Sequence, residues 1–251
     1  MAIEHIYLFG LTVLACMLCV SVQAREIYGN TNDPLSATVL NTEIHTADPD
    51  EMRFVILAKL MERYAIEHHI EVRRQEIDAY LASLRRVAEN HRKQNEARRE
   101  DLTLRLNTET LTEDERASLS SQLESLNKLM ETLDEGMNAS KEDPEAVRKD
   151  REQVAAAFIR QWKIDWALYK QYGGRIVLQQ GGPEPLDAYR HFLEEQEKRG
   201  SFTILNKAFV AKFWDYYRND TIHRFYPAGS LEEAQAFKKP WWLKDIPVEE
   251  P

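Results

Sequence analysis

The chain has few cysteines, and their positions limit its chemistry. Only two of its 251 residues are cysteines, and both, Cys16 and Cys19, lie in an apolar N-terminal stretch. If that stretch is removed on export, the remaining protein has no disulfide bond, no thiolate nucleophile and no cysteine-based metal site. We therefore expect packing alone to stabilise the fold.

Glycine is also scarce, with nine residues, and no glycine motif of nucleotide or acyl-transfer chemistry is present. The pairs Gly173-Gly174 and Gly181-Gly182 match neither a phosphate-binding loop nor a dinucleotide fingerprint, and Gly-x-Ser-x-Gly is absent. The net charge of −9, with both signs interspersed, is typical of a poor nucleic-acid binder. We expect no cofactor and no nucleic-acid partner.

Lysine and arginine are missing from positions 1–24, where an apolar run at 6–20 precedes Val22-Gln23-Ala24. The run is short for a membrane span, and the small residues at 22 and 24 fit a cleavage site. We interpret 1–24 as a signal peptide, which predicts export to the periplasm of a bacterial envelope and no membrane span in the mature chain. The alternatives are an uncleaved leader that tethers the protein to the membrane and a lipoprotein signal at Cys16 or Cys19.

Aromatic residues at helical spacing are abundant between 143 and 174. Asp143 and Pro144 suit the start of a helix, and Gly173-Gly174 suits its end. Between them one helix face recurs at steps of three and four residues, at Val147, Arg151, Val154, Phe158, Trp162, Trp166, Tyr169 and Tyr172, and all of these but Arg151 are apolar. We predict a central helix roughly 40 Å long, whose apolar partners come from 51–86 and 185–242.

The segments before this helix predict one strand and two helices. Residues 25–36 are polar and predict a flexible lead-in, and 37–44 alternate as in a short strand. A helix follows at 51–67, and a second begins at Gln75 after a link at 68–72. Beyond the central helix, 175–180 predict a strand that could pair with 37–44. Helices are expected at 186–199, after Asn206 and after Ser230.

Residues 89–138 carry the pattern of a charged helical hairpin. The first half alternates acidic and basic residues, and Thr112 with Glu115 forms a capping box for the second half. An a/d-type seam follows at Leu119, Leu123, Leu126, Met130 and Leu133. Because the row facing it is largely polar, this seam is a candidate docking surface for a partner helix or for self-association.

The predicted fold class is mostly α. A helical core, formed by N-terminal and C-terminal segments around the long central helix, carries an inserted antiparallel helical hairpin and at most a short two-stranded ribbon. The expected organisation is a signal peptide at 1–24, a lead-in at 25–36, a discontinuous core domain, a hairpin and a tail. The core domain comprises 37–88 and 139–242, the hairpin 89–138 and the tail 243–251.

A strand, a helix, a link and a second helix follow one another in 37–86. The strand is ATVLNTEI, the first helix is MRFVILAKLMERYAIEHH, and the step into the second is carried by Ile70, Val72, Glu76, Ile77 and Asp78. This order resembles the N-terminal unit of SurA-type periplasmic chaperones and their foldase relatives. Asn41-Thr42 replaces that family's usual Asn-Gly/Asp turn, and His69 replaces its glycine.

The resemblance implies that the N-terminal helices pack with a later helix of the same chain. In the family, parvulin-type prolyl isomerase domains are inserted between them. The insert at 89–138 is too short and too helical to be such a domain, so we expect no isomerase activity.

Two polar clusters are candidates for chemistry. His68-His69 lies between Glu67 and Glu71, but adjacent helical residues point about 100° apart and no His-x-x-x-His pair exists, so we expect no metal site. The second cluster, Glu184, Asp187, Arg190 and His191, could supply acid–base groups. Its simpler interpretation is a helix entry, in which acidic residues favour the helix N-terminus. We predict no catalytic residue.

Three functions remain open. The first is an exported, non-enzymatic, chaperone-like protein that binds unfolded or extended segments of envelope proteins. Its expected client-binding residues are Phe54, Leu57, Met61, Phe158, Trp162, Trp166, Tyr169, Trp241 and Trp242. The second is an assembly scaffold that works through the hairpin seam. The third is an envelope enzyme with an unrecognised site near Glu184 and His191.

Overall fold

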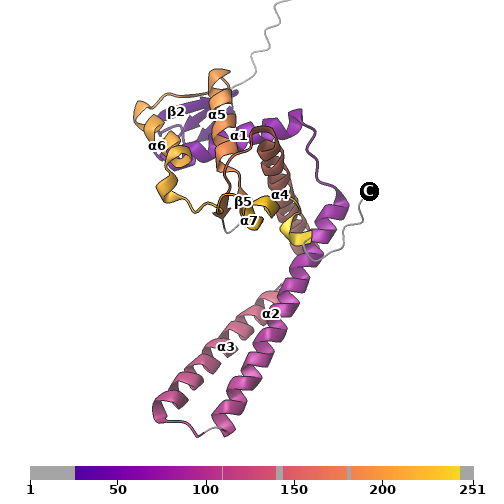
Figure 1. Ribbon diagram of the computed structural model, residues 1–251. Helices are drawn as coiled ribbons and strands as arrows, with labels where there is room; N and C mark the ends of the chain where they lie inside the picture. The colour runs from indigo at the N-terminus through magenta and orange to yellow at the C-terminus, as the bar shows by residue number, and fades with distance from the viewer. Residues whose placement is uncertain (1–25, 109, 140–143, 180–181, 244–251) are drawn as a thin grey trace, which may run out of the picture. The chain divides into compact units, whose positions relative to one another are not determined.

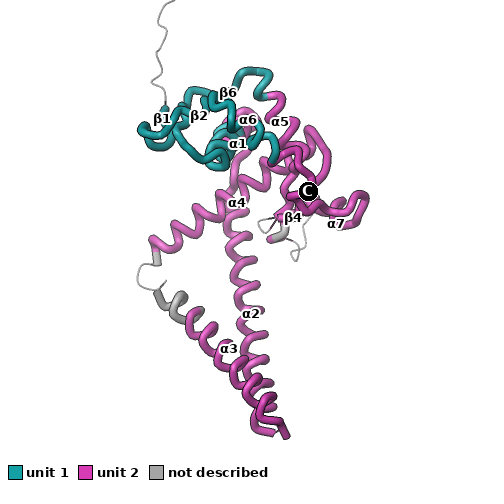
Figure 2. Tube along the Cα trace, turned by 90° about the vertical axis from the view of Figure 1, so that its left-hand side faces the viewer, with its two compact units in different colours: residues 1–60, 196–215 teal, residues 61–195, 216–251 magenta. Residues whose placement is uncertain are grey.

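The computed structural model describes residues 26–108, 110–139, 144–179 and 182–243 (Figure 1). Within these ranges seven α-helices and two small sheets form a mostly α fold, as predicted. The chain divides into two compact units (Figure 2). The first comprises the residues up to Leu60 together with 196–215, and the second comprises 61–195 together with the residues from Tyr216 on. None of the described helices is both long enough and apolar enough to cross a membrane.

The first unit contains a four-stranded sheet. Its strands, in the order in which they pair, are β1 (Glu26–Gly29), β3 (Thr42–His45), β2 (Leu35–Val39) and β6 (Phe202–Ile204). β1 is parallel to β3, and the other pairs are antiparallel. The sheet buries Ala37, Val39, Ile44 and Phe202. Ala37 and Val39 are two residues apart on β2, so they point to the same face of the sheet.

Two helices complete the first unit. The first three turns of α1 (Pro49–Glu67) bury Met52, Val55, Ile56 and Leu60. Polar contacts tie α1 to the edge strand, since Lys59 Nζ lies 2.7 Å from a Glu26 carboxylate oxygen. From α6 (Lys207–Arg218), Phe213 places its ring 5.5 Å from that of Phe202. Asn206 caps α6 by accepting the Ala208 N–H, as the sequence predicted.

The strand predictions are corrected in three respects. The expected strand at 37–44 is a hairpin that reverses at Leu40, whose φ is 53°. The predicted lead-in at 25–36 contains β1, and the sheet has four strands instead of at most two. The segment at 175–180 contains β4 (Val177–Gln179), which pairs with β5 (Gly182–Glu184) and not with 37–44. These strands are three to five residues long, too short for alternation to reveal their partners.

The second unit is built from long helices. α2 (Arg74–Thr108) and α3 (Glu113–Ala139) form an antiparallel hairpin (Figure 1). α4 (Pro144–Tyr172) crosses the first turns of α2, where Tyr80, Ala155 and Ile159 are buried together. Shorter elements follow: α5 (Leu186–Lys198), the 3₁₀ turn Asp220–Ile222, α7 (Leu231–Gln235) and the 3₁₀ turn Trp241–Leu243.

The ends of the long helices follow the sequence signals. Thr112 Oγ1 accepts the Glu115 N–H, and the Glu115 carboxylate accepts the Thr112 N–H at 2.9 Å, which completes the capping box of α3. Gly173 and Gly174 end α4 with φ values of 64° and 93°. Gly174 also lies against α5, because a Cβ there would be 2.4 Å from the Asp187 Cβ. That close approach positions the start of α5 beside the end of α4.

Candidate functional site

The candidate site is an aromatic face on α4, formed by Phe158, Trp162, Trp166 and Tyr169. These residues are spaced by four, four and three positions, so they share one side of the helix. The Trp162 and Trp166 rings stack with centroids 5.7 Å apart, and Tyr80 from α2 stacks on Phe158 at 6.1 Å. α4 therefore presents a continuous row of rings inside the second unit.

The C-terminal segment, residues 231–243, covers part of this face. The Phe237 ring lies 5.1 Å from Tyr169, and the Trp242 ring lies 5.8 Å from Trp162 and 5.4 Å from Tyr80. Phe237 and Trp242 are both buried. The pairs that involve Trp242 are edge-to-face, an arrangement that the aromatic quadrupole favours. The chain thus packs its own aromatic side chains on the aromatic face.

The rest of the face is open to solvent. Phe158 is 46% exposed, Trp166 is 39% exposed, and Val154, one turn before Phe158, is 55% exposed. The ammonium group of Lys170 lies 4.4 Å from the centre of the Trp166 ring, which favours a cation above it. Three large apolar side chains exposed along one helix form a patch of the kind that binds other molecules.

The expected client-binding residues fall into different environments. Phe158, Trp162, Trp166, Tyr169 and Trp242 come together at the aromatic face. Met61 is buried, with its sulfur 3.5 Å from the Gln161 amide nitrogen. Phe54 and Leu57 belong to the first unit, where Phe54 is exposed and Leu57 half-buried. The Trp241 side chain lies outside the described residues.

The predicted seam is packed inside the hairpin. Leu119 and Leu126 are buried against Leu102 of α2, and Leu123 and Met130 pack on the same cluster. The facing row is largely polar, but Leu102 and Leu106 of α2 pack against these seam residues, of which Leu123 and Met130 stay partly exposed. The Leu133 side chain lies outside the described residues.

A buried polar cluster lies between α4 and α5, and no pattern in the sequence pointed to it. Asp165 accepts hydrogen bonds from the Tyr189 hydroxyl and from the Gln161 amide, the latter at 2.7 Å. Burial raises the pKa of Asp165 to about 7, and the charge on Glu184 adds to the shift, although the two hydrogen bonds oppose it. Burial also raises the pKa of Tyr189. The carboxyl group therefore holds a proton in mildly acidic solution.

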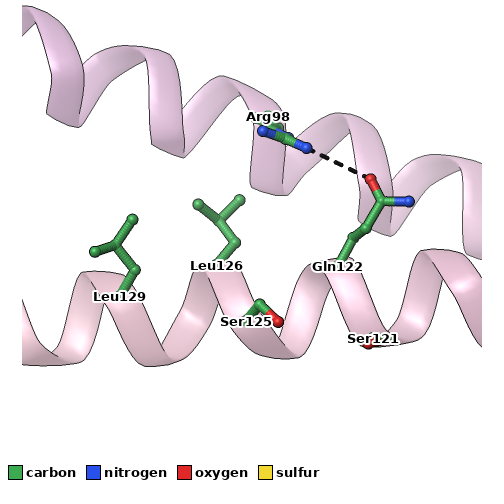
Figure 3. A pocket seen from close by; sticks show the side chains of 6 residues that line it. All are labelled: Arg98, Ser121, Gln122, Ser125, Leu126 and Leu129. Carbon is green, nitrogen blue, oxygen red and sulfur yellow. Dashed lines mark hydrogen bonds between the residues drawn. The ribbon is translucent and has the colours of Figure 1, made fainter. Parts of the chain in front are cut away.

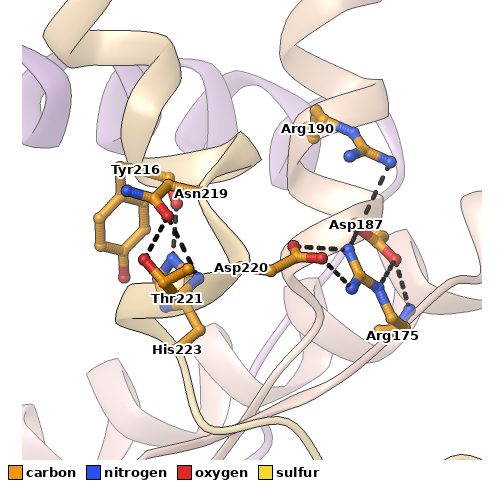
Figure 4. Close-up of polar contacts among 8 residues, drawn as sticks. All are labelled: Arg175, Asp187, Arg190, Tyr216, Asn219, Asp220, Thr221 and His223. Atoms are coloured by element: carbon orange, nitrogen blue, oxygen red, sulfur yellow. Dashed lines mark hydrogen bonds and ion pairs between the residues drawn. The ribbon is translucent and has the colours of Figure 1, made fainter.

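A second polar network surrounds Arg175 (Figure 4). Its guanidinium nitrogens lie 2.9 Å from Asp187 and 2.7 Å from Asp220, and Arg190 lies 3.3 Å from Asp187. Burial acts to raise the pKa of Asp187, but hydrogen bonds from the Arg175 side chain and backbone outweigh it, so the pKa is lowered. The hydrogen bonds to Asp187 and Asp220 raise the pKa of Arg175. The network joins the segment before β4 to α5 and to the 3₁₀ turn after α6.

These contacts define the surroundings of the candidate acid–base cluster. Asp187 is paired with two arginines, and Glu184 accepts a hydrogen bond from the Tyr216 hydroxyl at 3.3 Å. His191 is exposed, with its ring 6.5 Å from Tyr172. The charged groups of this cluster pair with residues of neighbouring elements, so the cluster links the segment before β4 to α5 and to the 3₁₀ turn. We call this set of ion pairs a structural clamp.

His68 and His69, the histidine pair, belong to no metal site among the residues that the structure describes. His68 stacks on Tyr64 with ring centroids 4.0 Å apart, and His69 has a positive φ of 52° at the end of α1. Among the residues that the structure describes, no group of three or more histidine, cysteine, aspartate or glutamate side chains is placed to hold a metal ion.

Comparisons with known proteins identify no relative of this chain. No protein-family model matches the chain. No curated protein and no solved structure is significantly similar to it.

Proposed function

We propose that this protein is a chaperone-like binder of unfolded or extended polypeptide, which acts in the bacterial envelope without a catalytic step. Clients would bind to the open part of the aromatic face, at Val154, Phe158 and Trp166. The observation that carries the proposal is that these large apolar side chains stay exposed on a helix whose remaining aromatic residues are packed. The N-terminal apolar stretch and the SurA-like order of 37–86 support the cellular setting.

The C-terminal segment indicates which chemistry the face accepts. Phe237 and Trp242 pack there through their rings, five residues apart in sequence. A client segment with two aromatic side chains at a similar spacing would make the same edge-to-face and tilted contacts. Unfolded outer-membrane proteins, whose strands carry aromatic girdles, present such segments.

The test measures whether the purified protein slows aggregation of an unfolded outer-membrane protein. We expect slower aggregation at a few-fold molar excess, and a loss of that effect in the double variant Phe158→Ser/Trp166→Ser. The matched control is Leu178→Ser/Leu205→Ser, because these two leucines are 44% and 46% exposed and lie outside the aromatic face. Equal activity in both double variants would contradict the proposal, as would no effect of the unaltered protein. Circular dichroism of each variant checks that the fold is kept.

A further inference from the structure

The helical hairpin has a hollow on its surface, distinct from the aromatic face. The hollow has a volume of about 280 Å³ and lies where α2 and α3 pack together (Figure 3). Arg98 borders it from α2, and the other lining residues come from α3: Ser121, Gln122, Ser125, Leu126 and Leu129. Leu126 is buried at its base, whereas Leu129 is 49% exposed.

The side chains that line the hollow suit a helical partner. Ser121, Ser125 and Leu129 are spaced by four residues and therefore form one row along α3. The two serines keep the surface low, so that a neighbouring helix can approach, and Leu129 offers an apolar contact at the end of the row. A groove between two helices with this lining is the seat that a third helix occupies in a bundle.

The charges of the hairpin identify the partner. From position 85 on, α2 carries seven basic and four acidic residues, whereas α3 carries two basic and seven acidic residues. The hairpin of a second copy is therefore complementary in charge to the first hairpin when the basic α2 of one copy lies on the acidic α3 of the other. In a two-fold dimer each copy contributes the same α2–α3 surface. The α2–α3 contact between the copies therefore forms twice.

The size of the surface also fits a second copy. The part of α2 from 85 to 108 has 24 residues, so it is about 36 Å long. In each copy α2 and α3 lie side by side over this length, and together they present about 700 Å² of surface. This is near the roughly 800 Å² per partner of a standard interface. The hairpin's own interior is small, since Leu102, Leu119 and Leu126 form its buried apolar cluster.

We propose that two copies of this chain associate through their hairpins into a four-helix bundle, with α2 of each copy against α3 of the other over the Ser121–Leu129 hollow. The contact buries Leu129 and pairs helices of opposite charge. It is independent of client binding at the aromatic face, so either property can be lost without the other.

Sedimentation equilibrium of the purified protein tests the proposal. We expect a concentration-dependent dimer that Leu129→Arg weakens at least tenfold, because the variant places an unpaired charge in the contact. Leu104→Arg is the matched control, since Leu104 is 61% exposed on α2 and does not line the hollow, and it should dimerise as the unaltered protein does. Raising the salt concentration from about 50 to about 500 mM should weaken the dimer through screening.

Three results would overturn the proposal. A monomer at every concentration would refute association, and equal dimerisation of Leu129→Arg and Leu104→Arg would refute the location. A dimer that salt strengthens would refute the pairing of α2 with α3, because helices of like charge would then be in contact. Circular dichroism separates all of these from unfolding, since both substitutions fall on exposed helical positions.

Discussion

Replacing Asp165 by Asn should make the protein more stable at pH 8 and change little at pH 4. The pKa of Asp165 rises from its ordinary value of 3.8 to about 7 in the folded protein. The folded state therefore holds the proton more tightly than the unfolded chain does, and stability falls as pH rises between these two values. The stabilisation is complete below about pH 4 and is lost as pH passes through about 7.

The size of the effect follows from the pKa difference. A shift of about 3 units corresponds to about 4 kcal/mol, at about 1.4 kcal/mol per unit. The substituted amide keeps an oxygen that can accept the hydrogen bonds of Tyr189 and Gln161, and it carries no charge at any pH. The unfolding free energy of the variant should therefore exceed that of the unaltered protein by up to about 4 kcal/mol at pH 8, and the gap should close towards pH 4.

Urea unfolding at pH 4, 5, 6, 7 and 8, followed by circular dichroism, measures this difference. Asp187→Asn is the control, because Asp187 is similarly shielded from solvent but has a lowered pKa beside Arg175. Its carboxylate stabilises the fold above its unfolded pKa and loses that effect as pH falls, so this variant should lose most stability at pH 8. If the Asp165→Asn profile runs parallel to that of the unaltered protein, Asp165 does not hold a proton near neutral pH.

Two further substitutions test the contacts around the end of α4. Arg175→Met should cost about 3–5 kcal/mol in urea unfolding, because it leaves the carboxylate of Asp187 buried without its main cation. Arg218→Met removes an exposed pair with Glu194 and should cost less than about 1 kcal/mol, so equal losses would contradict the clamp. Gly174→Ala should lower the thermal midpoint more than Gly173→Ala. Both glycines have positive φ, but an added Cβ meets a neighbouring residue only at Gly174, and equal midpoints would argue against that close approach.

The helices could be predicted because their signals are local. Pro144, Gly173, Thr112 and Asn206 mark helix ends through contacts within a few residues, and the bounds of the long helices follow them. The sheet could not be predicted in the same way. β2 pairs with β6, more than 160 residues further along the chain, and no local pattern connects strands that distant.

The candidate site was predictable to a similar extent. The spacing of Phe158, Trp162 and Trp166 placed them on one face, since helical periodicity fixes that relation. Which part of the face stays open could not be predicted, because it depends on Phe237, in a segment too short to show periodicity. Asp165 lies in the same stretch of the sequence, and its burial depends on Tyr189, 24 residues later on another helix.

The covering of the aromatic face also has a consequence for biosynthesis. Trp162 is translated 80 residues before Trp242, which packs on it. Until Trp242 has left the ribosome, the row of indole and phenyl rings lacks this cover, and exposed apolar surface of that kind promotes aggregation of incomplete chains. Until the residues from Phe237 to Trp242 are made, a larger part of the aromatic face is therefore exposed than in the folded chain.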